Sequence, residues 1–196
     1  MKRLSFVASV VTVVGYLSLA LLAWTRFPNA YGPASNWLSD LGSGAANPAG
    51  ASFYNAGIVL AGVCTLLFFL GLSVWKMAGN RKQLAMLYLT QTFGSLGALA
   101  MVLSALFPIH TGDAHAFWSA ALFILLGTGF AFSVAAFRYH AAYPRWLLFV
   151  GVAVTIEDFV WSVALNIPVV EWITVGLFLL YVLLVGIETR RRAEPA

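Results

Sequence analysis

The sequence predicts an all-α, polytopic integral membrane protein in which six transmembrane helices form one bundle. Of its 196 residues, 61% are hydrophobic and only 9% are charged, and the mean hydropathy is +0.88. A soluble domain carries about 25% charged residues, so this chain lacks the polar side chains needed to cover a surface in water. At about 20 apolar residues per span, the chain holds six helices and little else. We therefore expect a single domain over residues 1–196.

Six apolar segments are long enough to cross the hydrocarbon core of a bilayer. They are residues 5–24, 53–75, 84–106, 115–137, 146–165 and 169–187. The first segment follows Met1-Lys2-Arg3, as in a signal peptide, but it is longer than the roughly 7–15 residues of a signal core. We interpret it as the first span. Small residues four positions apart favour close helix contacts. Such pairs are Gly57 with Ala61, Gly94 with Ala98, and Gly129 with Ser133.

The basic residues indicate how the bundle is oriented. Ten of the 11 Lys and Arg residues fall on one side of the predicted spans: Lys2, Arg3, Lys76, Arg81, Lys82, Arg138, Arg145, Arg190, Arg191 and Arg192. Only Arg26 falls on the other side. Because loops rich in Lys and Arg stay in the cytoplasm, both termini are predicted to be cytoplasmic, in a protein of the cell membrane. The net charge of +4 then reflects topology and anionic lipid headgroups, not nucleic acid.

The side opposite the termini holds one long connection, residues 25–52, which is rich in Gly, Pro, Ser and Asn. Loops longer than about 12–15 residues are commonly functional or disordered. This one contains Tyr31, Trp37 and Leu41, which favour an ordered cap over the bundle. Residues 35–41 are expected to form one or two helical turns at the membrane interface.

Two adjacent carboxylates, Glu157 and Asp158, lie in the middle of the fifth predicted span. An acid near the bilayer centre costs about 2.5–3.5 kcal/mol on insertion scales, and repulsion between neighbours favours one of the two carrying a proton. Intramembrane acids are functional candidates by default, so both are candidate catalytic residues. The structural alternative is that they hydrogen-bond hydroxyls, such as those of Thr92, Ser95 or Tyr16, and hold the helices together.

His110, Asp113 and His115 lie around the connection between the third and fourth spans. Imidazole nitrogens and carboxylate oxygens suit a divalent metal as well as acid–base chemistry. The three residues are therefore a candidate metal site, and a divalent metal is the one cofactor that the sequence suggests. His115 lies about one turn inside its helix and is also a candidate catalytic residue. In the alternative, Asp113 is the N-cap of the fourth helix and His110 lies among headgroups.

Asp40, within the segment Ser39-Asp40-Leu41-Gly42, is the last candidate catalytic residue. If the long loop folds back over the bundle, Asp40 meets His115 and the carboxylates of the fifth span. The alternative is a turn or cap in which Gly42 supplies a positive φ.

Three short segments together resemble a known family. They are residues 39–42, residues 48–57 with Pro48 and Asn55, and Phe107-Pro108 followed by His115. They resemble the bacterial and archaeal membrane family called domain of unknown function 998, which is similar to the DRAM/Frag/Sfk group of six-helix proteins linked to lysosomal autophagy control and lipid remodelling. The resemblance covers nearly the whole chain and implies fold and topology, but no settled activity. The positions that match its motifs are Asp40, Gly42, Pro48, Asn55, Pro108 and His115.

Three functions stay open from the sequence. One is a lipid-binding or scaffold membrane protein, in which the acids organise the bundle. Another is a lipid hydrolase or transferase that uses acid–base groups or a divalent metal to activate water. The third is a proton-linked carrier or channel in which Glu157 and Asp158 relay protons. Membrane lipids are the expected partners, and a homo-oligomer is open.

Overall fold

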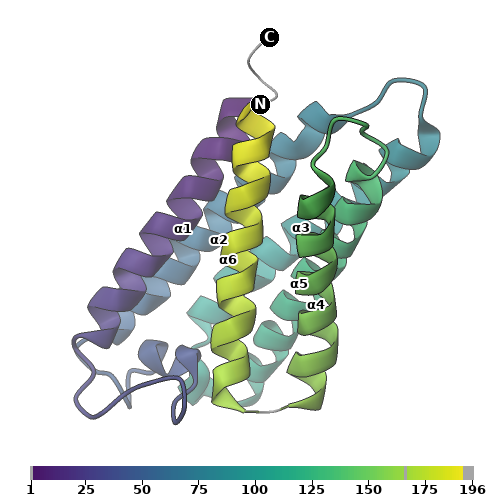
Figure 1. Ribbon diagram of the computed structural model, residues 1–196. Helices are drawn as coiled ribbons and strands as arrows, with labels where there is room; N and C mark the ends of the chain where they lie inside the picture. The colour runs from purple at the N-terminus through teal and green to yellow at the C-terminus, as the bar shows by residue number, and fades with distance from the viewer. Residues whose placement is uncertain (1, 166, 192–196) are drawn as a thin grey trace.

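The computed structural model describes residues 2–165 and 167–191 (Figure 1). The described residues form six long α-helices with 3-10 turns between some of them, and they contain no β-strand. The bounds are α1 Lys2–Trp24, η1 Leu38–Gly42, α2 Ala51–Gly71, η2 Leu72–Trp75, α3 Arg81–Leu106, η3 Ile109–Thr111, α4 Asp113–Phe137, α5 Arg145–Ala164 and α6 Pro168–Arg191. Each helix agrees with a predicted span to within a few residues, so the all-α prediction is confirmed for this part of the chain.

Five of the helices within the described ranges are long and apolar enough to cross a membrane: α1, α2 together with η2, α3, α4 and α6. A helix needs about 20 apolar residues to span the hydrocarbon core. The length and composition of these five indicate a multi-pass membrane protein. The helix α5 is present, but its crossing of the membrane stays a prediction.

The six helices are arranged as a closed ring. Each helix packs against the next along the chain, and α6 returns to pack against α1. The contact between α3 and α4 is the most extensive, because glycines lie where the two helices meet. A Cβ atom on Gly129 would lie 2.9 Å from the backbone nitrogen of Gly94, which only small residues permit.

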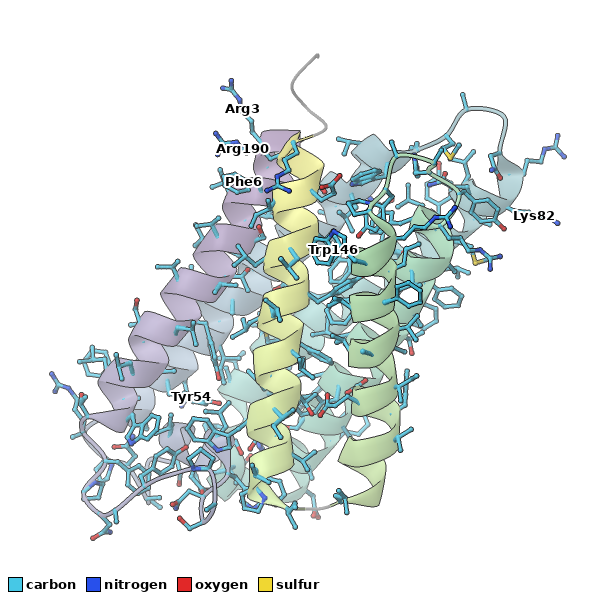
Figure 2. All side chains as sticks on the ribbon, in the orientation of Figure 1. Arg3, Phe6, Tyr54, Lys82, Trp146 and Arg190 are labelled. Atoms are coloured by element: carbon cyan, nitrogen blue, oxygen red, sulfur yellow. The ribbon has the colours of Figure 1, made fainter. Side chains whose placement is uncertain are left out.

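The two ends of the ring differ. We call the end with both chain termini the terminal end, and the end with residues 25–50, 107–112 and 165–167 the capped end. Figure 2 shows Arg3, Lys82 and Arg190 toward the terminal end and Tyr54 near the capped end. The side chains that fill the interior of the ring also differ between these two ends.

Large aromatic side chains fill the interior of the ring away from the capped end. Phe130 of α4 stacks on Phe69 of α2 with ring centroids 6.0 Å apart. It also meets Tyr181 of α6 edge-on at 5.0 Å. These three side chains and Phe68 are at most 1% exposed. Close packing of this kind leaves few voids. An interior cavity is therefore expected toward the capped end.

The connection between α1 and α2, residues 25–50, is called the first connection. It packs over the capped end through η1, whose Leu38 and Leu41 are 4% and 0% exposed. Gly42 does not have the positive φ that we expected, because the described residues with positive φ are Gly79 and Gly112. Gly42 is instead required by a close approach to α2. A Cβ at this position would meet the side chain of Asn55 and lie 2.8 Å from Tyr54 Cδ1. Asn55 Nδ2 donates a 3.0 Å hydrogen bond to the Gly42 carbonyl.

Candidate functional site

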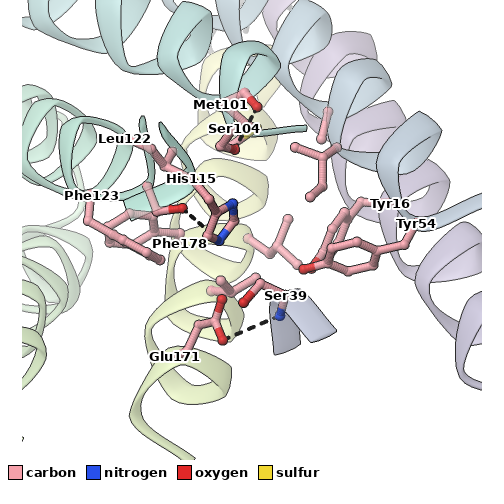
Figure 3. Close-up of a pocket in the computed structure, with 15 residues that line it drawn as sticks. Tyr16, Ser39, Tyr54, Met101, Ser104, His115, Leu122, Phe123, Glu171 and Phe178 are labelled. Carbon is pink, nitrogen blue, oxygen red and sulfur yellow. Dashed lines mark hydrogen bonds between the residues drawn. The ribbon is translucent and has the colours of Figure 1, made fainter. Parts of the chain in front are cut away.

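A pocket lies inside the ring at the capped end (Figure 3). Its inner cavity has a volume of about 80 Å³ and is lined by η1 and by every helix except α5. An outer cavity of about 350 Å³ continues from it toward the α5–α6 connection. The residues that line both cavities are Ser39, His115, Ser119, Phe123 and Glu171. Because these walls are shared, we treat the two cavities as one pocket.

The pocket has a polar mouth and an apolar floor. The hydrogen-bonding residues Ser104, His115, Ser119 and Glu171 lie within about two turns of the capped ends of their helices. The floor lies about 5–12 Å farther into the bundle, at about 1.5 Å per helical residue, as the spacings from Ser119 to Leu122 and from Glu171 to Leu179 give. Its side chains are Ala61, Leu122, Phe123, Phe178 and Leu179. This gradient suits a ligand with one polar end and one apolar end.

His115 is held by a hydrogen bond at each ring nitrogen. Its Nδ1 lies 2.8 Å from the backbone carbonyl of Phe107, and its Nε2 lies 3.1 Å from Ser119 Oγ. A carbonyl can only accept, so Nδ1 carries the proton and Nε2 accepts the Ser119 hydroxyl. The Phe107 carbonyl is free to take part because it lies at the C-cap of α3, beyond the helical hydrogen-bond ladder. The sequence pointed to His115, but Ser119 was missed.

Glu171 fastens the first connection to α6. Its Oε2 accepts hydrogen bonds from the backbone nitrogens of Leu38 at 2.7 Å and Ser39 at 3.4 Å. These are the first N–H groups of η1, which have no partner inside their own helix. Glu171 was given no role from the sequence. An isolated acid in the first turn of the last apolar span was the available signal.

Further hydrogen bonds hold the same connection in place. Trp172 Nε1 donates to the Asn36 carbonyl at 3.0 Å, and the Tyr31 hydroxyl donates to the Trp37 carbonyl at 2.8 Å. Burial raises the pKa of the Tyr31 phenol above its usual value, and the Glu171 carboxylate raises it further. The phenol therefore keeps its proton and remains a donor.

Asp40 serves its own loop and does not reach the pocket. Its Oδ2 accepts a 3.0 Å hydrogen bond from the backbone nitrogen of Trp37, the residue before η1. Neither cavity of the pocket includes Asp40 in its lining. The carboxylate is therefore used as a cap, and the expected meeting of Asp40 with His115 and the α5 acids is not observed.

Glu157 and Asp158 are buried and face different neighbours. Their exposed fractions are 8% and 1%. Glu157 Oε1 accepts a 2.7 Å hydrogen bond from Thr174 of α6, so its partner is none of the three hydroxyls that we expected. Asp158 lies against Gly127 of α4, where a Cβ atom would collide with its carboxylate. Thr174 also lines the outer cavity, so Glu157 is one side chain away from the pocket.

The candidate metal ligands do not converge. His110 and Asp113 are exposed, and both ring nitrogens of His115 already have partners. Within residues 2–165 and 167–191 there is no group of three or more His, Cys, Asp or Glu side chains that could hold a metal ion. The N-cap of α4 is Gly112, at φ 63°, and Asp113 is the first helical residue, so the capping role expected for Asp113 is wrong.

These features define a class: a helical membrane protein whose ring of helices encloses a capped pocket. A family model described as "Protein of unknown function (DUF998)" matches residues 7–188. The chain therefore belongs to this family, as its motifs predicted. No curated protein and no solved structure matches the chain. The likeness to the DRAM/Frag/Sfk group stays a prediction.

Proposed function

We propose that the protein crosses the cell membrane six times with both termini in the cytoplasm. Basic residues gather toward the terminal end, which supports this orientation because Lys and Arg are retained on the cytoplasmic side. They include Arg3, Lys76, Arg81, Lys82, Arg138, Arg145, Arg190 and Arg191. Arg26 follows α1 at the capped end. The sixth span is α5, whose 20 residues have the length that a crossing requires.

In this orientation the pocket faces the outer side, and its function is to bind a membrane amphiphile with one apolar chain. The observation that carries the proposal is the polar mouth above an apolar floor. Ligand sites are typically apolar cavities with a few polar groups that fix orientation. The chain would lie against Ala61 and Phe178, and the polar head would hydrogen-bond at Ser39, His115 and Glu171.

The outer cavity supplies a route by which such a ligand enters. Its wall toward the α5–α6 connection is apolar and includes Leu165, Ile167 and Val170. Leu165 and Ile167 are 44% and 45% exposed, so this wall reaches the surface of the protein. An apolar entrance at the edge of the bundle, where the helices leave the membrane, admits a lipid without exposing its chain to water.

The pocket favours lipid binding over the other functions that the sequence left open. The metal-assisted enzyme has less support, because its candidate ligands do not form a cluster among the described residues. The proton-linked carrier relies on Glu157 and Asp158. Glu157 bonds Thr174 of α6 and Asp158 lies against Gly127 of α4, and neither acid lines the pocket.

Native mass spectrometry of the purified protein, titrated with monooleoylglycerol, tests the proposal. We expect one bound molecule per chain. Ala61→Phe should abolish binding, because the added ring fills the floor of the pocket. Val175→Phe fills a neighbouring part of the wall and serves if the first variant does not fold. Leu99→Phe is the matched control, since Leu99 is 48% exposed on α3. Equal binding by wild type and both pocket variants would contradict the proposal.

A further inference from the structure

We infer that Ser119 is a nucleophile that accepts the acyl group of an ester-bearing amphiphile, with His115 as its general base. The inference rests on the proposed binding function and adds a reaction to it. It assigns to the pocket an acyl-transfer activity in which an acyl-enzyme forms at Ser119 Oγ. Three observations support it: the hydrogen-bond geometry of the pair, the place of the pair in the pocket, and the imidazole nitrogen that accepts the hydrogen bond of the Ser119 hydroxyl.

The geometry is that of an activated hydroxyl nucleophile. Ser119 and His115 are one helical turn apart on the same face of α4, so the helix itself holds them together. Ser119 Oγ lies 3.1 Å from His115 Nε2, within the range for proton transfer. The Phe107 carbonyl, 2.8 Å from Nδ1, orients the ring and selects the tautomer with a free lone pair at Nε2. A nucleophile, a base and a group that orients the base are the parts such catalysis requires.

The hydroxyl of Ser119 differs from those of Thr128 and Thr155, which bond only within their own helices. A serine or threonine within a helix commonly donates to the carbonyl four residues earlier. Thr128 of the same helix does so, with its Oγ1 2.7 Å from the Ile124 carbonyl. Thr155 of α5 donates in the same way to the Gly151 carbonyl at 2.8 Å. Ser119 instead has an imidazole nitrogen as its partner. A base therefore accepts its hydrogen bond, whereas a backbone carbonyl accepts those of Thr128 and Thr155.

The pair also lies where an ester would be. Ser119 and His115 line both the inner and the outer cavity, at the level where the polar mouth meets the apolar floor. The next turn of α4 continues the wall with Leu122 and Phe123. In an amphiphile such as a monoacylglycerol, the ester joins the chain to the head. A chain on the floor and a head at the mouth therefore bring the ester carbonyl to the level of Ser119.

The reaction balances with water as the only co-reactant. Ser119 Oγ bonds to the ester carbonyl carbon while its proton passes to His115 Nε2. The bond from that carbon to the alcohol oxygen then breaks, and the leaving alcohol takes the proton from Nε2. A water molecule, deprotonated by the same nitrogen, attacks the acyl-serine ester. Its addition releases the carboxylic acid and returns the proton to Ser119 Oγ.

Labelling with a fluorescent fluorophosphonate, which modifies activated serines, tests the inference on the full-length protein in detergent. We expect a single labelled peptide containing Ser119, together with release of oleic acid from monooleoylglycerol. Ser119→Ala should abolish both signals. His115→Gln, which can still hydrogen-bond the Phe107 carbonyl but cannot act as a base, should lower both by about 10²–10⁴-fold. Thr128→Ala should match wild type, because Thr128 is half-buried, bonds only within its own helix and lies outside the pocket.

The outcomes separate this inference from the proposed function. Wild-type protein that binds monooleoylglycerol in native mass spectrometry but is not labelled at Ser119 overturns the inference and leaves binding intact. Protein that binds no monooleoylglycerol overturns the proposed function itself. Equal labelling of His115→Gln and Thr128→Ala overturns the role of His115 as base. Circular dichroism and gel filtration establish that each variant compared is folded.

Discussion

The carboxylate of Glu171 accepts a 2.7 Å hydrogen bond from the backbone nitrogen of Leu38, a residue 133 positions earlier in the chain. Glu171 also lines both cavities of the pocket. The same side chain therefore anchors the first connection and forms part of the pocket wall. The attachment of the first connection and the shape of the pocket are thus linked through Glu171.

Removing this anchor should loosen the first connection. Glu171→Ala leaves the backbone N–H groups of Leu38 and Ser39 without their acceptor, which should cost about 1–3 kcal/mol per unsatisfied group. Glu171→Gln keeps an oxygen that accepts and should lose much less. Thermal unfolding in detergent and proteolysis within residues 25–37 measure the difference. Identical behaviour of the Ala and Gln variants would show that the hydrogen bonds do not hold the connection.

Packing of α4 against α5 should depend on Gly127. In Gly127→Ala the new methyl group meets the carboxylate of Asp158, which is 1% exposed and has little room to move. Overpacking of this kind costs about 1–3 kcal/mol. Gly176→Ala is the matched control, since a Cβ there meets nothing within 4 Å. If the collision is the cause, adding Asp158→Ala should recover part of the loss, and simple additivity of the two losses would refute it.

The hydrogen bond between α5 and α6 should contribute to stability. Thr174→Val keeps the shape of the side chain but removes the donor to Glu157 Oε1, leaving a buried acceptor unpaired at a cost of about 1–3 kcal/mol. Thr128→Val removes a hydroxyl of a half-buried residue that is bonded only to the Ile124 carbonyl of its own helix, so its effect should be small. The midpoint of thermal unfolding compares the two. Similar shifts of the unfolding midpoint in both variants would mean that the hydrogen bond from Thr174 to Glu157 does not contribute to stability.

The proposed orientation can be measured by labelling of single cysteines in intact cells. Cys64 is the one native cysteine and is replaced by Ala. Ala30→Cys, exposed at the capped end, should react with a membrane-impermeant maleimide. Ala78→Cys, exposed between α2 and α3, should react only after the cells are opened. The reverse pattern, or reaction of both in intact cells, is incompatible with cytoplasmic termini.

The helices could be predicted from the sequence because apolar runs of the length of a membrane span are a local property of the chain. The motif residue Gly42 was interpreted through backbone conformation, whereas its real constraint is the side chain of Asn55. This contact depends on how η1 folds back onto the start of α2, which no local pattern encodes.

The candidate site was predicted only in part, for the same reason. His115 was found because it lies about one turn inside its predicted helix and matched a family motif. Its partner Ser119 lies four residues later on the same helix, and the His-x3-Ser spacing was the signal that could have found it. Asp158 was selected for its place in the middle of the fifth span and Asp40 for its segment of the long loop. Their actual neighbours, Gly127 and Trp37, depend on packing that the sequence does not reveal.

The most direct measurement is photo-crosslinking with a monoacylglycerol that carries a diazirine near the end of its chain. Bound in the pocket, the probe should crosslink to the floor residues Leu122 and Phe123 of α4 and Phe178 and Leu179 of α6. Excess monooleoylglycerol and the Ala61→Phe substitution should both remove these crosslinks. Crosslinks confined to outward-facing side chains such as Leu96 and Leu99, and unchanged in Ala61→Phe, would contradict a lipid-binding pocket.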